Sequence, residues 1–480
     1  MTTPARPRKV YKSSLYMRPM PECLVDFSSR EGKDMFRQAL EEGHMETYFR
    51  LAAQFTTQAD PAFCGLGTLC MVLNTLNVDP LRQWRYSPWR WYDDDMLDCC
   101  RSLDDVRDKG ITISEFGCLA TCNGLQAKVH RADLVTKEQF LEDIIRTSQC
   151  DDEVLVVSYF RGTLGQTGSG HFSPLGGYCA ATNSVLILDV ARFKYPPYWC
   201  PVDLIWNAML PHDPVTDKPR GYVLMSRSPA EAALPKLNLT TTTVARLVHH
   251  LTVEFPHKLA NDAELATLTP VDVLACALAC VPEELAHNVL TEREVHEVED
   301  DSGDDADADA EDAGPAPSCG TGCCAPKATR AAAYQAEFTQ LLHAVHELPL
   351  YHDVVAARAS AACNHADHAE HDQERANALL ALVLLSFPVA TIIPADHALA
   401  EAAPDCDAVL RAHWDLERVP LIVKREVVQL RTQMDALKCA ACDEVVAAVH
   451  RGGDAGEGEC HACHEVDEVH ATHAEANEAA

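Results

Sequence analysis

The sequence predicts an α+β domain in the first half of the chain and a mostly helical second half. Within the first half, helical patterns come first and short β-branched runs second, an order typical of α+β domains. Residues 297–318 are almost entirely Asp, Glu, Ala, Gly and Pro, and such a run buries too little apolar surface to offset its chain entropy. We therefore expect a flexible N-terminus (1–20), an α+β domain (21–230), a helical extension (231–296), an acidic disordered linker with a cysteine cluster (297–330) and a helical, partly disordered, Cys- and His-rich C-terminal region (331–480).

Apolar spacing locates the individual elements. Residues 29–55 bring their large apolar side chains close to one stripe, which predicts a helix. Residues 63–76, small and apolar, predict a second helix that opens at Cys64, directly after the turn Gln58-Ala-Asp-Pro. Short runs rich in β-branched residues predict strands at 154–159, 184–189 and 221–226. In the second half, helical periodicity occurs around 237–290, 331–348, 374–385 and 419–437.

The charge balance argues against some classes of partner. The chain has 40 Lys and Arg against 72 Asp and Glu, a formal charge of -32. Such a protein repels nucleic acid and anionic membranes, whereas cations are plausible partners. The longest apolar stretch, residues 378–393, is interrupted by Pro388 and falls short of the roughly 20 residues that cross a bilayer. We expect a buried helix there, and neither nucleic acid nor membrane as a partner.

The 21 cysteines are interpreted through the compartment. Residues 1–20 are basic but lack the apolar core of a secretory signal, so we expect a cytoplasmic protein. An organellar transit peptide stays open, because no acidic residue precedes Glu22. In a reducing compartment, cysteines serve catalysis or metal binding rather than disulfides.

One group of residues suggests a cysteine nucleophile. A helix N-terminus and a nearby imidazolium together lower a thiol pKa, and Cys64 meets the first condition. His171, in a Gly-rich run, and Asp189, at the end of the next predicted strand, offer a base and a group that orients it. Gln58 offers an amide N–H as an oxyanion donor. Each residue alone is more often structural, but the chain order Cys, His, Asp favours covalent catalysis on Cys64.

Several long stretches carry a resemblance to a known family. They are Leu24-Val-Asp-Phe-Ser-Ser, Phe55-Thr-Thr-Gln-Ala-Asp-Pro-Ala-Phe-Cys-Gly-Leu, Pro88-Trp-Arg-Trp-Tyr, Met96-Leu-Asp-Cys-Cys, the run from Arg161 to Gly177, Leu188-Asp-Val-Ala-Arg-Phe-Lys-Tyr-Pro-Pro-Tyr-Trp and Arg220-Gly-Tyr. Over about residues 14–227 the chain resembles phytochelatin synthase, a glutathione γ-glutamylcysteine dipeptidyltransferase.

The resemblance implies a papain-like fold, with a helical part and an antiparallel sheet. It implies Cys64 as nucleophile, His171 as general base and Asp189 as its orienter, with Gln58 completing the oxyanion hole. The thiolate would attack the Cys–Gly bond of glutathione, release glycine and keep γ-Glu-Cys as an acyl group. The amine of a second glutathione or of a growing chain would then take that group. Phe63 departs from the Tyr common in the family, which removes one hydroxyl from the donor pocket.

The resemblance also carries over substrate residues. It assigns substrate anchoring to Arg161, Gly170 and Asp213, a substrate carboxylate to Arg220, and the acceptor site to Arg192, Lys194 and Tyr195. Glutathione has two carboxylates, so a site in an acidic protein needs local cations, and four of these residues are Arg or Lys.

Metal enters this interpretation in two ways. The resemblance implies no organic cofactor, but cadmium, zinc or copper ions as activators, because metal–glutathione thiolates are acceptor substrates in the family. Thiols at metal-ligand spacing also occur in the second half, near His365, His368 and His371: Cys319, Cys323, Cys324, Cys439, Cys442, Cys460 and Cys463. Soft thiolates favour zinc, cadmium or copper(I). For Cys99, Cys100, Cys118 and Cys122, a structural role as small buried hydrophobes is as good an interpretation as any other.

Two other functions remain open at this stage. Water could take the acyl group, which would make the protein a glutathione or glutathione-conjugate peptidase. A thiol-rich, non-enzymatic metal-binding protein would rest on the second half alone. The expected partners are glutathione and metal–glutathione complexes, and a homodimer stays open.

Overall fold

The computed structural model describes residues 17–85, 89–228, 234–237, 250, 254–261, 265–278, 290–292, 330–360, 370–387 and 398–451, with the side chains of 236–237, 256, 291–292, 330, 360, 370–372, 398 and 437–451 excepted. These residues group into two units. The first comprises Met1–Leu76, Asp104–Ile113 and Ala127–Arg227, and the second comprises Asn77–Leu103, Ser114–Gln126 and Ser228–Ala480. The first unit ends close to the domain boundary expected near residue 230. Two segments that we assigned to the α+β domain, however, group with the second unit.

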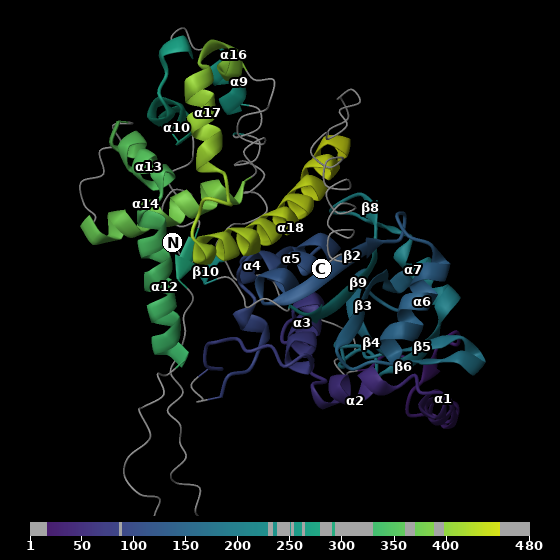
Figure 1. Cartoon of the computed structure of the whole chain (residues 1–480). Helices are drawn as coiled ribbons and strands as arrows, with labels where there is room; N and C mark the ends of the chain where they lie inside the picture. The colour runs from purple at the N-terminus through teal and green to yellow at the C-terminus, as the bar shows by residue number, and fades with distance from the viewer. Residues whose placement is uncertain are drawn as a thin grey trace, which may run out of the picture. The chain divides into compact units, whose positions relative to one another are not determined.

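A seven-stranded sheet forms the centre of the first unit (Figure 1). Its strand order is β1 (Val25–Asp26), β6 (Tyr198–Pro201), β5 (Ser184–Ile187), β4 (Gly170–Cys179), β3 (Glu153–Phe160), β9 (Gly221–Arg227) and β2 (Leu125–Arg131). The pairs from β1 to β9 along this order are antiparallel. The strands predicted at 154–159 and 221–226 are confirmed, whereas the one predicted at 184–189 ends at Ile187 and leaves Asp189 just beyond it.

The helical N-terminal part consists of three helices. The single helix expected over 29–55 is two, α1 (Arg30–Glu41) and α2 (Glu46–Ala53). The side chain of Ser29 caps α1 by accepting a hydrogen bond from the Gly32 N–H, and Gly43 with φ +78° turns the chain between the helices. Helix α3 (Cys64–Thr75) opens at Cys64 as predicted.

Helices cover both faces of the sheet (Figure 1). Helix α3 packs on β4, while α6 (Lys137–Ser148) and α7 (Val202–Met209) lie on the other face. A hydrophobic core cluster lies on that second face. In it, alternate side chains of β3 (Leu155, Val157 and Tyr159) meet apolar side chains of α6 (Phe140 and Ile144) and α7 (Ile205 and Met209). The observed class is therefore α+β, as the sequence predicted.

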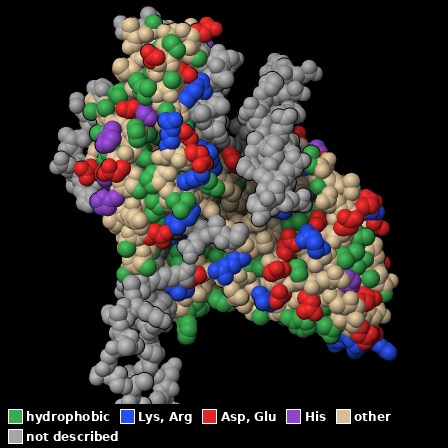
Figure 2. Space-filling view, viewed as in Figure 1, with side chains coloured by type: hydrophobic (Ala, Val, Ile, Leu, Met, Phe, Trp, Pro, Cys, Tyr) green, Lys and Arg blue, Asp and Glu red, His purple; other side chains and the backbone are tan. Residues whose placement is uncertain are grey.

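Shorter elements complete the first half. They are the helices α4 (Leu103–Lys109) and α5 (Ile113–Cys122), the 3-10 turns η1 (Asp94–Met96), η2 (Arg161–Leu164) and η3 (Ala180–Thr182), and the paired strands β7 (His212–Asp213) and β8 (Lys218–Pro219). On the face shown in Figure 2, acidic and basic side chains are interspersed over the unit that contains the sheet.

The second unit is mostly helical. Its described elements are α9 (Phe255–Ala260), η5 (Leu265–Thr267), α10 (Pro270–Leu278), α12 (Arg330–His346), α13 (Pro349–Ser360), α14 (Glu370–Ser386), α16 (Ala398–Ala402), α17 (Pro404–His413) and α18 (Leu421–Arg451). Strands β10 (Pro235–Leu237) and β11 (Leu290–Glu292) pair where only helix was expected. Residues 378–386 lie in α14 and are buried, as expected, while 388–393 and the acidic linker before residue 330 fall outside the described residues. Among the described helices, none combines the length and apolar character needed to cross a membrane.

Candidate active site

Cys64 is the first residue of α3, and the preceding turn sets its position. The Asp60 side chain accepts a hydrogen bond from the Ala62 N–H at 3.0 Å, and the Asp60 carbonyl accepts one from the Phe63 N–H at 2.9 Å. One turn into α3, the Thr68 hydroxyl donates to the carbonyl of Phe172 on β4 at 3.1 Å. That bond joins the helix carrying Cys64 to the strand carrying His171.

His171 and Asp189 form a buried hydrogen-bonded pair. The His171 Nε2 atom lies 2.8 Å from the Asp189 Oδ1 atom, and the two side chains are 4% and 0% exposed. The ring of Tyr159, on the paired strand β3, packs edge-on against the imidazole. Because Nε2 is engaged by Asp189, Nδ1 is the nitrogen left to serve the Cys64 thiol. Cys64 is only half-buried, so solvent or a ligand can reach it.

The charges around Cys64 favour a thiolate–imidazolium pair. Burial by itself raises the pKa of Cys64, but the hydrogen bond and charge of His171, the Phe172 N–H and the charge of Arg161 outweigh it, so the pKa is lowered. For His171, burial and the charge of Arg161 lower the pKa, yet the Asp189 carboxylate and the Cys64 hydrogen bond raise it above its ordinary value. A lowered thiol pKa beside a raised imidazole pKa produces a nucleophile charged near neutral pH.

Arg161 holds Asp189 in place. Its Nη2 atom donates to both carboxylate oxygens, at 2.9 and 2.7 Å, and its Nη1 donates to Gln166 Oε1 at 2.5 Å. The Ala191 N–H adds a further bond to Asp189 at 2.9 Å. Although burial raises the pKa of Asp189, His171 and Arg161 hold it well below its usual range. We expected Arg161 to anchor substrate, but it is 2% exposed and its guanidinium is committed to protein partners.

Gln58 lies beside the site but does not present a free amide. Its Nε2 atom donates to the carbonyls of Asp60 and Pro61 at 2.8 and 3.0 Å, and its own N–H donates to Val190 at 3.1 Å. The side-chain N–H groups of Gln58, which we expected to face an oxyanion, are thus hydrogen-bonded to carbonyls of the turn before α3. The buried Gln58 Oε1 has no hydrogen-bond partner.

Three residues assigned to substrate binding come together at the edge of the first unit. Asp213 and Arg220 form an ion pair at 3.6 Å, and Arg220 Nη1 also donates to the carbonyls of Pro211 and His212. Gly170 lies over the guanidinium, because a Cβ at this position would be 3.3 Å from Arg220 Nη2. The buried Arg220 Nε has no hydrogen-bond partner. The Arg220 side chain is only 3% exposed, whereas an arginine that binds carboxylates at the surface is open to solvent. Its Nε remains as a donor that no protein group uses.

Lys194 and Tyr195 gather around the loop before β4. The Lys194 Nζ atom donates to the Thr167 carbonyl at 3.4 Å, and the Tyr195 hydroxyl accepts from the Thr167 N–H at 2.9 Å. Between them, Gly168 has φ +118°, and a Cβ there would lie 3.2 Å from both Arg161 Cδ and Lys194 Nζ. The loop therefore requires glycine at this point.

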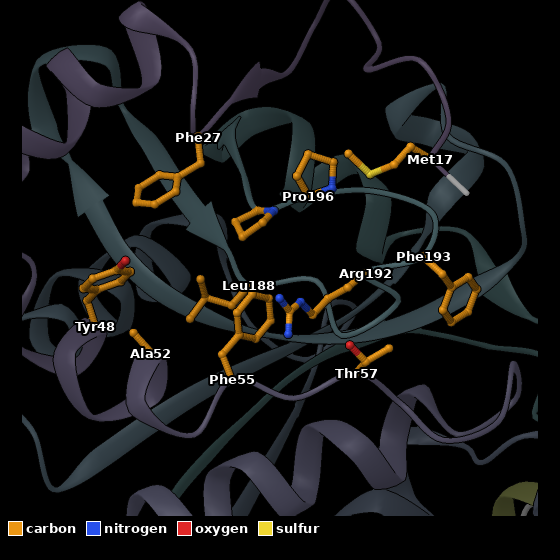
Figure 3. A pocket seen from close by; sticks show the side chains of 11 residues that line it. Met17, Phe27, Tyr48, Ala52, Phe55, Thr57, Leu188, Arg192, Phe193 and Pro196 are labelled. Atoms are coloured by element: carbon orange, nitrogen blue, oxygen red, sulfur yellow. The ribbon is translucent and has the colours of Figure 1, made fainter. Parts of the chain in front are cut away.

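Arg192 lies in a different place, a cavity of about 660 Å³. Its guanidinium carbon sits 4.8 Å from the centre of the Phe55 ring, and Figure 3 shows both side chains in the middle of the pocket. The remaining lining is mainly aromatic and apolar: Met17, Phe27, Tyr48, Ala52, Thr57, Leu188, Phe193, Pro196 and Pro197. The residues expected to bind the acceptor thus occupy two locations.

Residues 15–222 match the family model for phytochelatin synthase. These residues form a phytochelatin synthase domain.

Curated relatives agree with this assignment. The chain is 52% identical over 214 residues to a glutathione gamma-glutamylcysteinyltransferase of Schizosaccharomyces pombe, covering 45% of this chain and 51% of the relative. It is 47% identical over 223 residues to glutathione gamma-glutamylcysteinyltransferase 1 of Arabidopsis thaliana, covering 46% of each chain. A Lotus japonicus relative, glutathione gamma-glutamylcysteinyltransferase 3, is 47% identical over 216 residues, with 45% of each chain covered. The match therefore spans about half the length of these relatives.

Sequence reasoning missed several partners of the site in the phytochelatin synthase domain. Gln166 binds Arg161, the hydroxyls of Tyr159 and Tyr198 meet at 2.8 Å, and the Phe172 N–H faces the Cys64 sulfur. Gln166 and Tyr198 fall inside the resembling stretches. Their roles depend on contacts across the sheet, for which the chain order offered no signal.

The metal ligands expected outside the phytochelatin synthase domain cannot be placed. Cys319, Cys323, Cys324, Cys460, Cys463, His365 and His368 lie outside the described residues, and the side chains of His371, Cys439 and Cys442 are likewise not described.

Proposed function

We propose that this protein is a transpeptidase that moves the γ-Glu-Cys unit of glutathione onto a second glutathione or a γ-Glu-Cys oligomer, with Cys64 as the acyl carrier. The product would be phytochelatins that bind heavy metals. The observation that carries the proposal is the half-buried Cys64 thiol at a helix N-terminus, with its pKa lowered by a histidine that a buried carboxylate orients. The family match over residues 15–222 supports the same chemistry, and we propose a papain-like fold for this domain.

In the first step, the Cys64 thiolate attacks the carbonyl carbon of the Cys–Gly peptide bond. His171, as imidazolium, gives its Nδ1 proton to the departing glycine nitrogen when the tetrahedral adduct collapses. Asp189 stays ionised throughout, because Arg161 and His171 hold its pKa low. Glycine leaves, and a thioester joins γ-Glu-Cys to Cys64.

The oxyanion of that adduct forms at the start of α3. The first N–H groups of a helix lack intrahelical partners, so the Cys64 N–H is available to the oxyanion. Gln58 would serve as the second donor if its amide left the carbonyls of Asp60 and Pro61 when substrate binds. We therefore keep Gln58 as an oxyanion residue that substrate must reorient.

The paired charges of Asp213 and Arg220 suit the γ-glutamyl end of the donor. A γ-linked glutamate keeps both a free α-ammonium and a free α-carboxylate, which is a zwitterion. Asp213 matches the ammonium, and the unused Nε of Arg220 matches the carboxylate. Gly170, with no side chain, leaves Arg220 open to the ligand at this point.

We assign the remaining cationic side chains, Lys194 and Arg192, to the acceptor half-reaction. The acceptor amine attacks the thioester, with His171 taking its proton, and the peptide bond forms as Cys64 leaves. We propose Lys194 and Arg192 as the groups that hold acceptor carboxylates, with Tyr195 holding the loop before β4 that Lys194 contacts. The metal ion acts as part of the substrate, by joining glutathione thiolates. No organic cofactor takes part in these steps.

A glutathione peptidase is the second candidate, because it needs the same acyl-enzyme. The cavity around Arg192 favours transfer, since about 660 Å³ of largely apolar and aromatic lining can hold a peptide acceptor. We propose a cytoplasmic enzyme whose partners are glutathione and its metal complexes, without nucleic acid or membrane.

Product mass spectrometry tests this proposal. The full-length protein is incubated with glutathione, with and without cadmium, beside a Cys64→Ser variant and a Cys150→Ser control outside the site. We expect free glycine and a ladder of γ-Glu-Cys increments from the wild type and the control, and neither from Cys64→Ser. γ-Glu-Cys and glycine without a ladder would make the protein a hydrolase. Unchanged products from Cys64→Ser would remove Cys64 from the mechanism.

A further inference from the structure

Four buried cysteines lie close together in the second unit and take no part in the chemistry proposed for Cys64. Cys99 and Cys100 precede α4, and Cys118 and Cys122 lie one turn apart on α5. Their side chains are 8%, 1%, 0% and 3% exposed. The sulfur–sulfur distances are 3.8 Å for Cys99–Cys100, 3.3 Å for Cys100–Cys122 and 4.0 Å for Cys118–Cys122. The sulfurs of Cys99, Cys100 and Cys122 all lie within 4.8 Å of one another.

The three distances fit three of the six edges of a thiolate tetrahedron, and Cys118 would have to move closer to Cys99 and Cys100 to complete it. Zinc holds thiolates at about 2.3 Å, which places neighbouring sulfurs about 3.8 Å apart, and the larger cadmium ion widens that edge slightly. Burial of cysteines as small hydrophobic side chains does not by itself require their sulfurs to face one another. Burial raises the pKa of Cys100 and of Cys118, and the neighbouring thiols raise that of Cys100 further. A central cation would remove that penalty by stabilising the thiolates.

We propose that Cys99, Cys100, Cys118 and Cys122 form a binding site for one soft d10 metal ion, zinc or cadmium. Each thiol loses its proton to solvent as its sulfur becomes a ligand, so binding releases up to four protons and leaves the oxidation states unchanged. The site joins residues 99–100 to α5 and so ties together two segments of the second unit. Its role is structural, because it fills all four tetrahedral positions with protein ligands.

The surrounding amides suit thiolate ligands. The Asn123 Nδ2 atom lies 3.6 Å from Cys99 Sγ and is held by the Leu119 carbonyl at 2.7 Å. The Cys122 thiol points at Gln433 Oε1 on α18, 3.9 Å away. When Cys122 is deprotonated, the Gln433 amide must turn to present its N–H instead, which makes Gln433 an expected second hydrogen-bond donor to the metal thiolates.

A disulfide between Cys100 and Cys122 is the competing outcome. Their 3.3 Å separation is short enough for oxidation after a small shift. That disulfide would use only Cys100 and Cys122, however. It would not explain why the Cys99 sulfur lies 3.8 Å from that of Cys100, or why the Cys118 sulfur lies 4.0 Å from that of Cys122. The convergence of all four sulfurs favours the metal.

The first test compares metal content in full-length protein. The background carries Ser at Cys280, Cys319, Cys323, Cys324, Cys363, Cys439, Cys442, Cys460 and Cys463, so that Cys276 and Cys406 are the thiols that remain after residue 230. Onto it we add either Cys100→Ser with Cys122→Ser or, as matched control, Cys150→Ser. After loading with cadmium and desalting, we expect one metal equivalent and a cadmium–thiolate charge-transfer band in the background and the control. The cluster variant should lose both, and equal metal in all three would overturn the proposal.

A second measurement does not depend on the folding of the cluster variant. X-ray absorption on the cadmium-loaded background counts the sulfur ligands directly. Among the described residues, Cys99, Cys100 and Cys122 form a group whose ligand atoms converge closely enough to hold a metal. Three or four sulfurs per cadmium support the site. No bound cadmium, coordination by oxygen and nitrogen alone, or a Cys100–Cys122 disulfide in protein purified under reducing conditions would each contradict it.

Discussion

The His171 Nε2 atom and the Asp189 Oδ1 atom lie 2.8 Å apart, and the same carboxylate receives both bonds of the Arg161 Nη2 group. One buried anion therefore serves two cations. Burial and the charge of Arg161 lower the pKa of His171, while the charge and hydrogen bond of Asp189, together with the hydrogen bond of Cys64, raise it above its ordinary value. Asp189 therefore favours the protonated form of His171 and also supplies the counter-charge for the buried guanidinium of Arg161.

Asp189→Asn should damage both rate and stability. The neutral amide cannot favour the imidazolium, so kcat should fall by about 10²- to 10⁴-fold. The 2%-exposed Arg161 would be left without a counter-charge, which should lower the free energy of unfolding by about 3–5 kcal/mol. Steady-state kinetics and urea unfolding measure the two effects.

Asp203→Asn is the control for this variant. Asp203 pairs with Lys137 at 2.8 Å on the exposed surface, where water and salt screen the charges, so loss of this pair should hardly change the stability. An Asp189→Asn protein as stable as Asp203→Asn would contradict the buried ion pair.

The pH profile of kcat/KM should be bell-shaped. The thiolate exists above the pKa of Cys64, which is lowered, so the ascending limb should lie below the ordinary thiol value of about 8.5. The imidazolium exists below the pKa of His171, which is raised, so the descending limb should lie above about 6.5. Because Asp189 raises the pKa of His171, Asp189→Asn should move the descending limb to lower pH. A profile that rises only above the ordinary thiol pKa would argue against the ion pair.

Arg220→Lys and Arg192→Lys should separate donor from acceptor binding. Arg220 pairs with Asp213 at the proposed γ-glutamyl subsite, so its replacement should lower kcat/KM for glycine release by about 10- to 100-fold. Arg192 lines the separate cavity, so its replacement should leave the first-turnover burst of glycine unchanged and slow both later glycine release and chain growth. Timed assays of glycine and of oligomers distinguish the two. If both variants lost glycine release and chain growth to the same extent, the assignment of Arg220 to the donor and Arg192 to the acceptor would be wrong.

Gly168→Ala should affect the site, whereas Gly43→Ala should not. Both glycines have positive φ, +118° and +78°, so both substitutions strain the backbone, at about 1–3 kcal/mol. At Gly43 a Cβ meets nothing within 4 Å, but at Gly168 it crowds Arg161 and Lys194. We therefore expect kcat/KM to drop about 10- to 100-fold only in Gly168→Ala, with thermal unfolding measured alongside. Similar activity in the two variants would show that the loop before β4 does not position the site.

Local pattern predicted the catalytic helix and two of the strands well. The small and apolar residues after Pro61 indicate a helix that opens at Cys64, and α3 begins there. The interruption at Gly43 was missed, because the apolar spacing continues from α1 into α2 while the backbone turns. Local pattern did not indicate how far the cationic candidates are buried. Arg161 and Arg220 are cationic residues of the kind that bind substrate, yet both are almost fully buried on protein partners.

The sequence by itself determined the α+β class, the position of Cys64 at a helix start, and the order of Cys64, His171 and Asp189, because these depend on local spacing and composition. The tertiary structure alone decided which distant groups meet. It brought Arg161 onto Asp189, and it brought the sulfurs of Cys99, Cys100 and Cys122 within 4.8 Å of one another, with Cys118 4.0 Å from Cys122. The reason is physical: a periodic pattern specifies which face of an element is buried, but the partner buried against it is set by packing between segments far apart in the chain.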